Sequence, residues 1–273
     1  MTLHLVRLAV DLRGLASFAV AKGIGDDDGG YALHLALRDR FGAAGPQPFR
    51  FFPEHRRGPH LLGYAMEGDA LKDAAGLPVI DDLLRGVFPG AAEIQPMPDA
   101  WREGSRYGFK VRVRPVVRYG GRVRAERRIR PGAWQNRAGE VDAFVAACEK
   151  AGHLEEGGAP VDREAVYKGW LEKRLAGAAG IEAAELRQLR RVNTKRSLHA
   201  KPSPADRERA GGGHHVRGRR LGVRGAEGPE ALMAGTLAVA DPDAFARLLA
   251  RGVGRHAAFG FGMLLLSPPG RAS

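Results

Sequence analysis

Residues 252–266 read G-V-G-R-H-A-A-F-G-F-G-M-L-L-L and join a well-marked helix to an apolar strand. The helix is predicted to have Asp241 as its N-cap and Pro242 as its first residue, and to end at the first glycine of this stretch. Glycine allows positive φ and close approach of another chain to the backbone. Arg255 and His256 place a cation and a hydrogen-bonding ring inside the loop. The stretch therefore predicts either a tight turn beside a sheet or a receptor for a phosphate backbone.

The elements around this stretch are predicted to occur in the same order twice. Periodicity and Gly or Pro breaks predict first-half strands and helices at 3–10, 31–41, 49–52, 61–66, 69–86 and 92–95, with a loop at 11–30. The second-half elements are predicted at 107–117, 140–151, 163–176, 186–198, 219–239, from Pro242 onward and at 263–266. Both halves approximate β-α-β-β-α-β. We therefore predict an α+β fold of two tandem ferredoxin-like (RRM-like) domains, residues 1–98 and 107–273, with an insertion near 131–162.

The net charge of +12 is concentrated in two segments of the chain. Residues 101–137 contain twelve Arg or Lys and two acidic residues, and residues 187–224 have the same balance, so each segment carries +10. The remaining residues together carry −8. Arginine-rich segments favour a polyanionic ligand, because guanidinium groups bind phosphates and stack on bases. This pattern predicts a nucleic-acid partner. Neither segment has the continuous apolar stripe of a membrane-surface helix.

Two further features bear on where the protein works. No run of eighteen or more apolar residues predicts a membrane span. The single cysteine, Cys148, lies in a pattern of Val, Ala and Phe that is typical of a small core residue. One cysteine cannot form an intrachain disulfide, which fits a reducing compartment. We therefore expect a cytoplasmic protein that does not contact membranes.

The helix at residues 31–41 carries the candidate catalytic groups. Its core stripe is predicted from the spacing i, i+4, i+8 of Leu33, Leu37 and Phe41. Tyr31, His34 and Arg38 follow i, i+3, i+7 and share an adjacent face. RNA supplies its own nucleophile, the 2′-OH, so cleavage needs proton transfer, which histidine performs near neutral pH, and stabilisation of charge at the phosphate. Such a site needs no metal. An ordinary surface histidine has the same spacing, so both interpretations stay open on geometry alone.

Three stretches carry a resemblance to a known family. They are Y-x-x-H at Tyr31 and His34, Y-G-F-K-V-R-V-R-P at residues 107–115, and the ending L-L-A-R-G-V-G-R-H-A-A-F-G-F-G-M-L-L-L-S-P at 248–268. With them the chain resembles CRISPR-associated endoribonucleases of the CasE type, subunits of the Cascade surveillance complex in the RAMP superfamily. The likeness covers both ends and the middle junction, whereas residues 131–162 and 211–220 have no clear counterpart.

The resemblance implies a function as well as a fold. Such enzymes have two ferredoxin-like domains, cut the 3′ side of a CRISPR repeat hairpin without metal or cofactor, and stay bound to their product. By position, Tyr31 and His34 match the catalytic pair. The residues implied or expected to bind RNA are Lys195, Arg196, Arg219 and Arg220 of the basic hairpin, Arg38 from helical geometry, and Arg255 and His256 in the terminal loop. The partners implied are a repeat RNA stem-loop and other Cascade subunits.

Two alternatives stay open beside this interpretation. In the first alternative the protein is a non-catalytic RNA-binding subunit that kept the fold and the RNA contacts. In the second it is a metal-dependent nuclease built on Asp26, Asp27 and Asp28. We interpret the three aspartates as a solvated turn whose negative charge suits the N-terminus of the following helix. Cleavage that resists EDTA would exclude the metal-dependent alternative.

Overall fold

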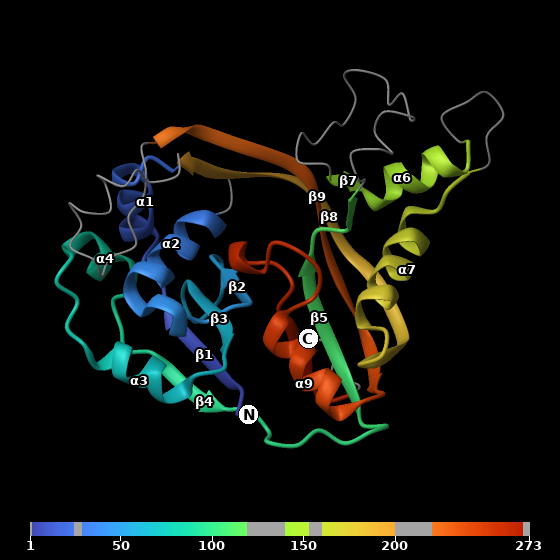
Figure 1. The fold of residues 1–273 in the computed structure, drawn as a ribbon, viewed down its shortest axis with the longest axis horizontal. Helices are drawn as coiled ribbons and strands as arrows, with labels where there is room; N and C mark the ends of the chain where they lie inside the picture. Colours follow the sequence, from blue (N-terminus) through green and yellow to red (C-terminus); the bar gives the residue numbers. More distant parts are fainter. Residues whose placement is uncertain (1, 25–28, 119–139, 153–159, 200–219, 270–273) are drawn as a thin grey trace, which may run out of the picture.

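The computed structural model describes residues 2–24, 29–118, 140–152, 160–199 and 220–269. It contains two four-stranded antiparallel sheets, one from each half of the chain, and a two-stranded sheet (Figure 1). Within the described residues, no helix is long and apolar enough to cross a membrane.

The first half of the chain builds a sheet with the strand order β2-β3-β1-β4. Its elements are β1 (His4–Ala9), α1 (Leu12–Ala21), α2 (Gly30–Phe41), a short 3₁₀ turn η1 (Gly42–Ala44), β2 (Phe49–Phe52), β3 (His60–Ala65), α3 (Gly68–Gly76), α4 (Asp82–Val87) and β4 (Glu93–Pro96). The helices cover one face, where Leu33 of α2 and Phe18 of α1 pack with Phe49 and Leu61 of the sheet. The predicted helix at 69–86 is broken as expected and forms α3 and α4.

Helix α1 corrects the predicted loop at residues 11–30. The Asp11 side chain caps it by accepting a hydrogen bond from the Gly14 amide at 2.6 Å. Leu15 and Phe18, spaced i, i+3, are buried in the first core. Gly14 allows α1 to approach α4, because a Cβ there would lie 1.9 Å from the Gly86 carbonyl oxygen. The helix was overlooked because its apolar residues surround the helix instead of forming a stripe.

The second half repeats the arrangement with the strand order β10-β5-β9-β8. Its elements are β5 (Arg106–Val113), β6 (Val116–Arg118), β7 (Glu140–Asp142), α6 (Ala143–Lys150), α7 (Arg163–Leu175), β8 (Ala179–His199), β9 (Arg220–Val239), α9 (Pro242–Arg251), a 3₁₀ turn η2 (Ala257–Phe259) and β10 (Leu264–Ser267). With β6, β7 and α6 set aside, each half is β-α-β-β-α-β with its last strand beside its first. The predicted α+β fold of two ferredoxin-like domains is confirmed, while the boundaries 1–98 and 107–273 stay a prediction.

The second core lies between the sheet and helices α7 and α9. Val111 of β5 and Met233 of β9 pack with Leu171 and Phe245 of the two helices. The two halves also meet, because the buried Tyr64 hydroxyl of β3 donates a hydrogen bond to the Leu264 carbonyl of β10 at 2.9 Å. Cys148 is buried, as expected for a small core residue, and so are the aromatic side chains of Trp101 and Trp170.

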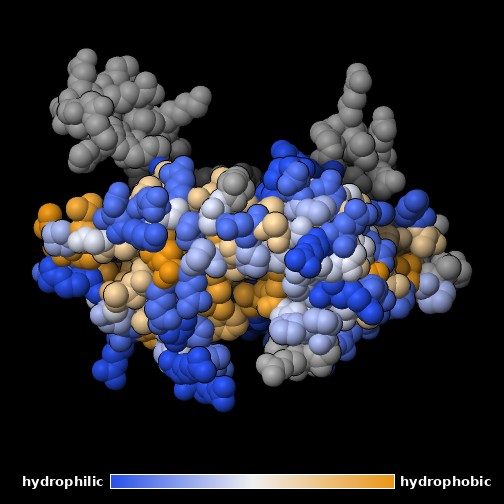
Figure 2. Space-filling view, turned by 90° about the horizontal axis from the view of Figure 1, so that it is seen from below, coloured by the Kyte–Doolittle hydropathy of each residue, from blue (hydrophilic) through white to orange (hydrophobic). Residues whose placement is uncertain are grey.

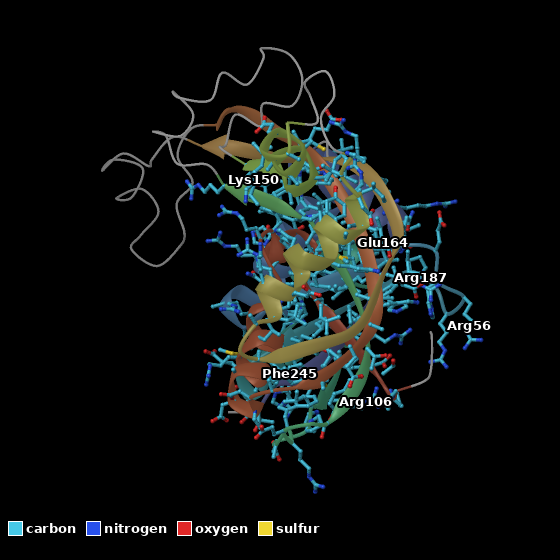
Figure 3. The ribbon with its side chains drawn as sticks, turned by 90° about the vertical axis from the view of Figure 1, so that its right-hand side faces the viewer. Arg56, Arg106, Lys150, Glu164, Arg187 and Phe245 are labelled. Atoms are coloured by element: carbon cyan, nitrogen blue, oxygen red, sulfur yellow. The ribbon has the colours of Figure 1, made fainter. Side chains whose placement is uncertain are left out.

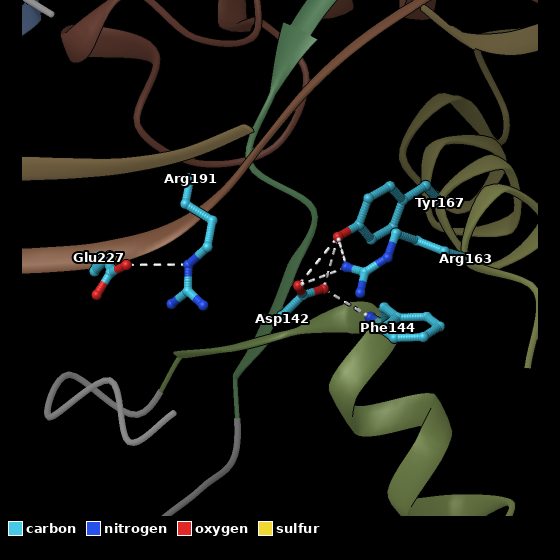
Figure 4. Close-up of polar contacts among 6 residues, drawn as sticks. All are labelled: Asp142, Phe144, Arg163, Tyr167, Arg191 and Glu227. Atoms are coloured by element: carbon cyan, nitrogen blue, oxygen red, sulfur yellow. Dashed lines mark hydrogen bonds and ion pairs between the residues drawn. The ribbon is translucent and has the colours of Figure 1, made fainter. Parts of the chain in front are cut away.

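Helix α6 is anchored to α7 by a buried polar cluster (Figure 4). Asp142 caps α6 by accepting the Phe144 amide proton at 2.8 Å, and its carboxylate also accepts a hydrogen bond from the Tyr167 hydroxyl at 3.0 Å. The Arg163 guanidinium lies 3.4 Å from the same carboxylate and 3.7 Å from the centre of the Phe144 ring. Burial raises the pKa of Asp142, although these hydrogen bonds and the Arg163 charge oppose it.

Exposed apolar side chains gather at the connection between α3 and α4. Leu77, Ile80 and Leu83 are all exposed there. In the view from below, hydrophobic colour is strong at the left edge, which is the side of α4 in Figure 1 (Figure 2). Elsewhere on this face hydrophobic and hydrophilic residues are mixed.

Candidate functional site

Helix α2 orients the candidate catalytic pair. It begins after Gly29, which has a φ of 68°, and buries its predicted core stripe of Leu33, Leu37 and Phe41. On the adjacent face, Tyr31 is 8% exposed and His34 is half-buried. Their ring centroids lie 6.2 Å apart with an angle of 28° between the planes. The sequence spacing therefore translates into neighbouring rings.

The glycine-rich loop of the second half reaches this pair through Phe259. The Phe259 ring meets the His34 ring edge to face, with 5.4 Å between centroids, and the Tyr31 ring in a similar way at 5.7 Å. Its other neighbour is His256, at 6.0 Å. Two segments more than two hundred residues apart in the sequence thus form one aromatic cluster at the junction of the halves (Figure 1).

The path of this loop depends on glycine at two positions in particular. Gly262 has a φ of 78°, and a Cβ there would lie 2.6 Å from the Val253 carbonyl oxygen. Gly262 also accepts a hydrogen bond from the Val253 amide at 2.8 Å, which closes the loop. Gly260 has a φ of 83° and passes close to Phe49 and Arg112. The interpretation as a tight turn beside a sheet is confirmed for this stretch.

Glu140 holds the two polar residues of the loop. Its carboxylate is buried and lies 2.5 Å from Nε of Arg255 and 3.0 Å from Nε2 of His256. The hydrogen bond with His256 lowers the pKa of Glu140 against the opposing effect of burial, and the charges of His256, Arg255 and Arg114 lower it further. Arg255 remains half-exposed, whereas His256 is largely enclosed. His256 has a φ of 67°, unusual for a residue other than glycine.

The remaining predicted RNA contacts lie on α2 and on the β8–β9 hairpin. Arg38 is exposed one turn beyond His34. Lys195 and Arg196 lie on β8, paired with Gly225 and Arg224 of β9, and Arg220 pairs with His199. The hairpin extends from the second sheet across the first half toward α1 and α2 (Figure 1). Arg219 and the aspartates at 26–28 lie outside the described residues. Among the residues that the structure describes, no group of three or more side chains could hold a metal ion.

A second polar cluster lies beneath the loop, and the sequence analysis did not single it out. Arg112 is 8% exposed, and its Nη2 lies 2.6 Å from the buried Glu230 carboxylate. Nε of Arg190 donates to the other oxygen of Glu230 at 2.8 Å. Burial would raise the pKa of Glu230, but the hydrogen bond and charge of Arg112, followed by those of Arg190, keep it below its usual value. The Arg112 guanidinium also lies 4.2 Å from the Phe261 ring centroid, so it supports the loop.

Comparison with protein families identifies the chain over nearly its whole length. The family model described as "CRISPR associated protein" matches residues 3–268. The chain belongs to this CRISPR-associated protein family. Comparison with the sequences of curated proteins gives no match.

Solved structures share the fold of this CRISPR-associated protein. A CRISPR endoribonuclease Cse3 bound to a 19-nucleotide RNA has a TM-score of 0.54 and 19% identity, with 98% of this chain and 100% of that chain covered. Cse3 of Thermus thermophilus, bound to an RNA representing a pre-cleavage complex, gives 0.55 and 18% at the same coverage. At this identity the likeness establishes a common fold, the two-domain ferredoxin-like architecture.

The structure of this CRISPR-associated protein brings two pairs of predicted residues together. Tyr31 and His34 lie together and meet the glycine-rich loop. Arg255 and His256 share one carboxylate. Phe259, Glu140 and the Arg112 cluster are functional candidates that the sequence analysis missed. Arg112 of β5 and Arg114 just after it alternate with apolar residues, which was a signal for the cluster, and both are buried.

Proposed function

We propose that this protein is a metal-independent endoribonuclease that cleaves CRISPR repeat RNA hairpins and stays bound to its product. The observation that carries the proposal is the packing of Tyr31 and His34 against Phe259 at the junction of the two halves, because a histidine side chain is suited to proton transfer near neutral pH. Membership in the CRISPR-associated family and the fold shared with RNA-bound Cse3 support it.

The chemistry requires a base, an acid and a stabiliser of negative charge. The 2′-oxygen attacks the adjacent phosphorus as its proton is removed, and the 5′-oxygen of the next nucleotide leaves as it gains a proton. The products are a 2′,3′-cyclic phosphate and a 5′-hydroxyl. His34 performs one of the proton transfers, a contribution of about 10²–10⁴ in rate. Tyr31 orients the 2′-OH or the leaving oxygen, and Arg38 offers positive charge to the phosphate.

RNA affinity comes from a different part of the molecule. The β8–β9 hairpin carries Lys195, Arg196 and Arg220 on a long ribbon directed toward α2. Together with Arg219, these cations would hold the stem by its phosphates, while sequence is read at unpaired or distorted bases. Arg255 and His256 would contact RNA beside the catalytic pair. A product held in this way is suited to delivery into a Cascade-type complex, whose other subunits are the proposed protein partners.

The test is cleavage of a repeat hairpin by the purified protein in EDTA. One RNA is unmodified, and its copy carries a 2′-deoxy sugar just upstream of the cut. We expect cleavage of the first RNA alone, and His34→Ala should abolish it while RNA affinity stays within about twofold, because proton transfer in the transition state is lost and phosphate contacts are not.

Three other outcomes would overturn the proposal in different ways. Binding of both RNAs without cleavage would make the protein a non-catalytic RNA-binding subunit. Cleavage that EDTA abolishes would indicate a metal-dependent nuclease. A large loss of affinity in His34→Ala would show that this residue binds RNA instead of transferring a proton.

A further inference from the structure

The sheet faces opposite the helices carry a second set of candidate ligand-binding residues. In β2, Phe49 and Phe51 face the first core, so Arg50 and Phe52 lie on the other face. In β5, Phe109 and Val111 face the second core, so Lys110 and Arg112 lie on the other face. Arg190 of β8 joins them through Glu230. We call the half-buried and exposed members, Arg50, Phe52, Lys110, Arg187 and Arg190, the basic sheet face.

An aromatic stack lies at the edge of this face. Phe52 is half-buried, and its ring stacks on His60 with 5.2 Å between centroids and 18° between planes. The Arg50 guanidinium lies 4.9 Å from the Phe52 ring centroid, and His55 meets His60 edge to face at 4.6 Å. The buried His60 is held by Gly58, whose carbonyl lies 2.9 Å from Nδ1. The stack therefore holds an aromatic ring and a guanidinium group together at the edge of this face, where a base could lie beside them.

Arg187 pairs with Glu185, but Arg50 has no acidic partner among the described residues. Both oxygens of Glu230 are already engaged, by Arg112 and Arg190. Among the described residues, no carboxylate lies within ion-pair distance of Arg50, and its buried Nη1 has no hydrogen-bond partner. Burial and the charges of Arg112 and Arg190 together lower the pKa of Arg50 to about 10, against the opposing effect of Glu230. Burial, Arg50 and Arg187 likewise lower the pKa of Lys110. An incoming anion would relieve this repulsion.

The face continues at both ends and approaches the catalytic junction. Arg187 is 48% exposed and Arg190 54%. Arg187 and Arg56, which lies in the turn after β2, project on the same side of the molecule in Figure 3. At the inner end, Arg112 lies close to Gly260, because a Cβ placed on this glycine would be 3.4 Å from Arg112 Nη1. Gly260 in turn follows Phe259, which contacts His34. The basic sheet face and the Tyr31–His34 pair are thus separated by one layer, the glycine-rich loop.

We propose that the basic sheet face binds single-stranded RNA that flanks the repeat hairpin, with a base stacked beside Phe52 and phosphates at Arg50 and Arg190. This inference rests on the proposed function. Unpaired RNA fits better than duplex, because a half-buried ring beside guanidinium groups can stack only on a base that is not already enclosed in a helix. The chemistry does not distinguish a 5′ flank from a 3′ flank, so both are tested.

The experiment measures the equilibrium affinity of the full chain for four RNAs by fluorescence anisotropy. All carry the 2′-deoxy sugar that blocks cutting. The first is the hairpin alone, and the second and third carry about eight unpaired nucleotides added 5′ or 3′ of it, a length within the range that single-strand sites cover. The fourth is the hairpin with a flank of the same length that lacks bases. The variants are Arg50→Gln and Phe52→Leu. Lys72→Gln on α3, outside the basic sheet face, is the control for loss of charge.

We expect one of the flanks to tighten binding on the order of tenfold, the scale of one stacked base. Phe52→Leu should remove most of this gain for the flank with bases and change nothing for the abasic flank, which retains only phosphates. Arg50→Gln should reduce the gain for both. All variants should bind the hairpin alone within twofold of the parent and should cleave an unmodified hairpin at the parent's rate. Lys72→Gln should bind every RNA as the parent does.

The proposal is overturned if neither flank tightens binding, or if the two variants weaken the hairpin alone as much as the flanked RNA. Failure of the proposed function would look different. An unmodified hairpin would then bind without being cut, whatever happens to the flanked RNAs.

Discussion

Phe259 is the side chain through which the second half of the chain contacts His34 and Tyr31. It is half-buried, packs against the first core, and its ring centroid lies within 6 Å of the His34 and Tyr31 ring centroids. Its position suggests that it limits the rotamers of the catalytic pair, because proton transfer requires orientation as well as reach. Phe259 is on this argument a positioning residue, not a catalytic one.

Phe259→Ala should lower the single-turnover cleavage rate about tenfold or more at saturating protein, because a misplaced catalytic group loses orientation. RNA affinity should remain within about twofold. Phe259→Leu retains apolar bulk against both rings and should recover most of the rate. A rate for Phe259→Ala equal to or above that of the parent would show that this ring does not position the pair.

Glu140 makes stability depend on pH in a direction set by its lowered pKa. In the unfolded chain the carboxyl titrates near its ordinary value of 4.5. The folded state holds the ionised form more tightly, so the stabilisation is fully present above that value and is lost as pH falls through the lower folded pKa. We expect Glu140→Gln to reduce the dependence of unfolding free energy on pH below about 4.5.

The measurement is urea unfolding at a series of pH values between about 3 and 6, the range over which acidic groups titrate. Glu103→Gln, at an exposed position, is the matched control and should leave the slope of the parent. An unchanged slope in Glu140→Gln would mean that the contacts with His256 and Arg255 do not favour the ionised carboxylate.

At the scale of elements, the glycine-rich segment has a conformation that side chains would prevent. Gly262 combines a positive φ with a backbone oxygen where a Cβ would lie. Gly76, the last residue of α3, has neither constraint and nothing within 4 Å of a Cβ. The two glycines therefore differ in what an added methyl group would meet.

Gly262→Ala should lower the free energy of unfolding by at least about 1–3 kcal/mol, because it adds strain at positive φ and a backbone clash. Gly76→Ala should raise it by about 0.4–1 kcal/mol by restricting the unfolded chain. Thermal and urea unfolding measure both, and Gly262→Ala should also slow cleavage by displacing Phe259. Equal stability of the two variants would contradict this account of the loop.

One missed helix and one strand that begins earlier than predicted show what the local sequence pattern leaves undecided. Helix α1 is capped by Asp11, but both its packing partner and the close approach at Gly14 come from α4, some seventy residues later. Strand β8 begins at Ala179, seven residues before the predicted start, where A-G-I-E-A-A has little strand propensity. Pairing with the well-formed β9 overrides that propensity.

At the scale of the whole molecule, charge is separated from the candidate chemistry. The catalytic pair lies at the junction of the halves, while many predicted phosphate contacts lie on the β8–β9 hairpin. Affinity and cleavage should then respond to different substitutions. A protein that binds and cuts with a single set of residues would not show this separation.

Arg220→Ala should weaken binding of the hairpin and reduce the slope of log affinity against log salt concentration by about one unit, because one phosphate contact is lost. The single-turnover rate at saturating protein should not change. Lys72→Ala removes the same charge outside the hairpin and should leave the slope unchanged. A parent-like slope for Arg220→Ala would remove this residue from the RNA interface.

The sequence by itself determined the order of most elements, the two-domain fold, the buried stripe of α2 and the neighbouring positions of Tyr31 and His34. These depend on local periodicity, caps and breakers, which act over a few residues. Only the tertiary structure decided that Phe259 meets His34, that Glu140 holds Arg255 and His256, and that Arg112 is buried on Glu230. Such contacts join residues far apart in the chain, and their partners follow from how the two sheets pack. For the same reason the sequence around β5 did not show that Arg112 and Arg114 would be buried.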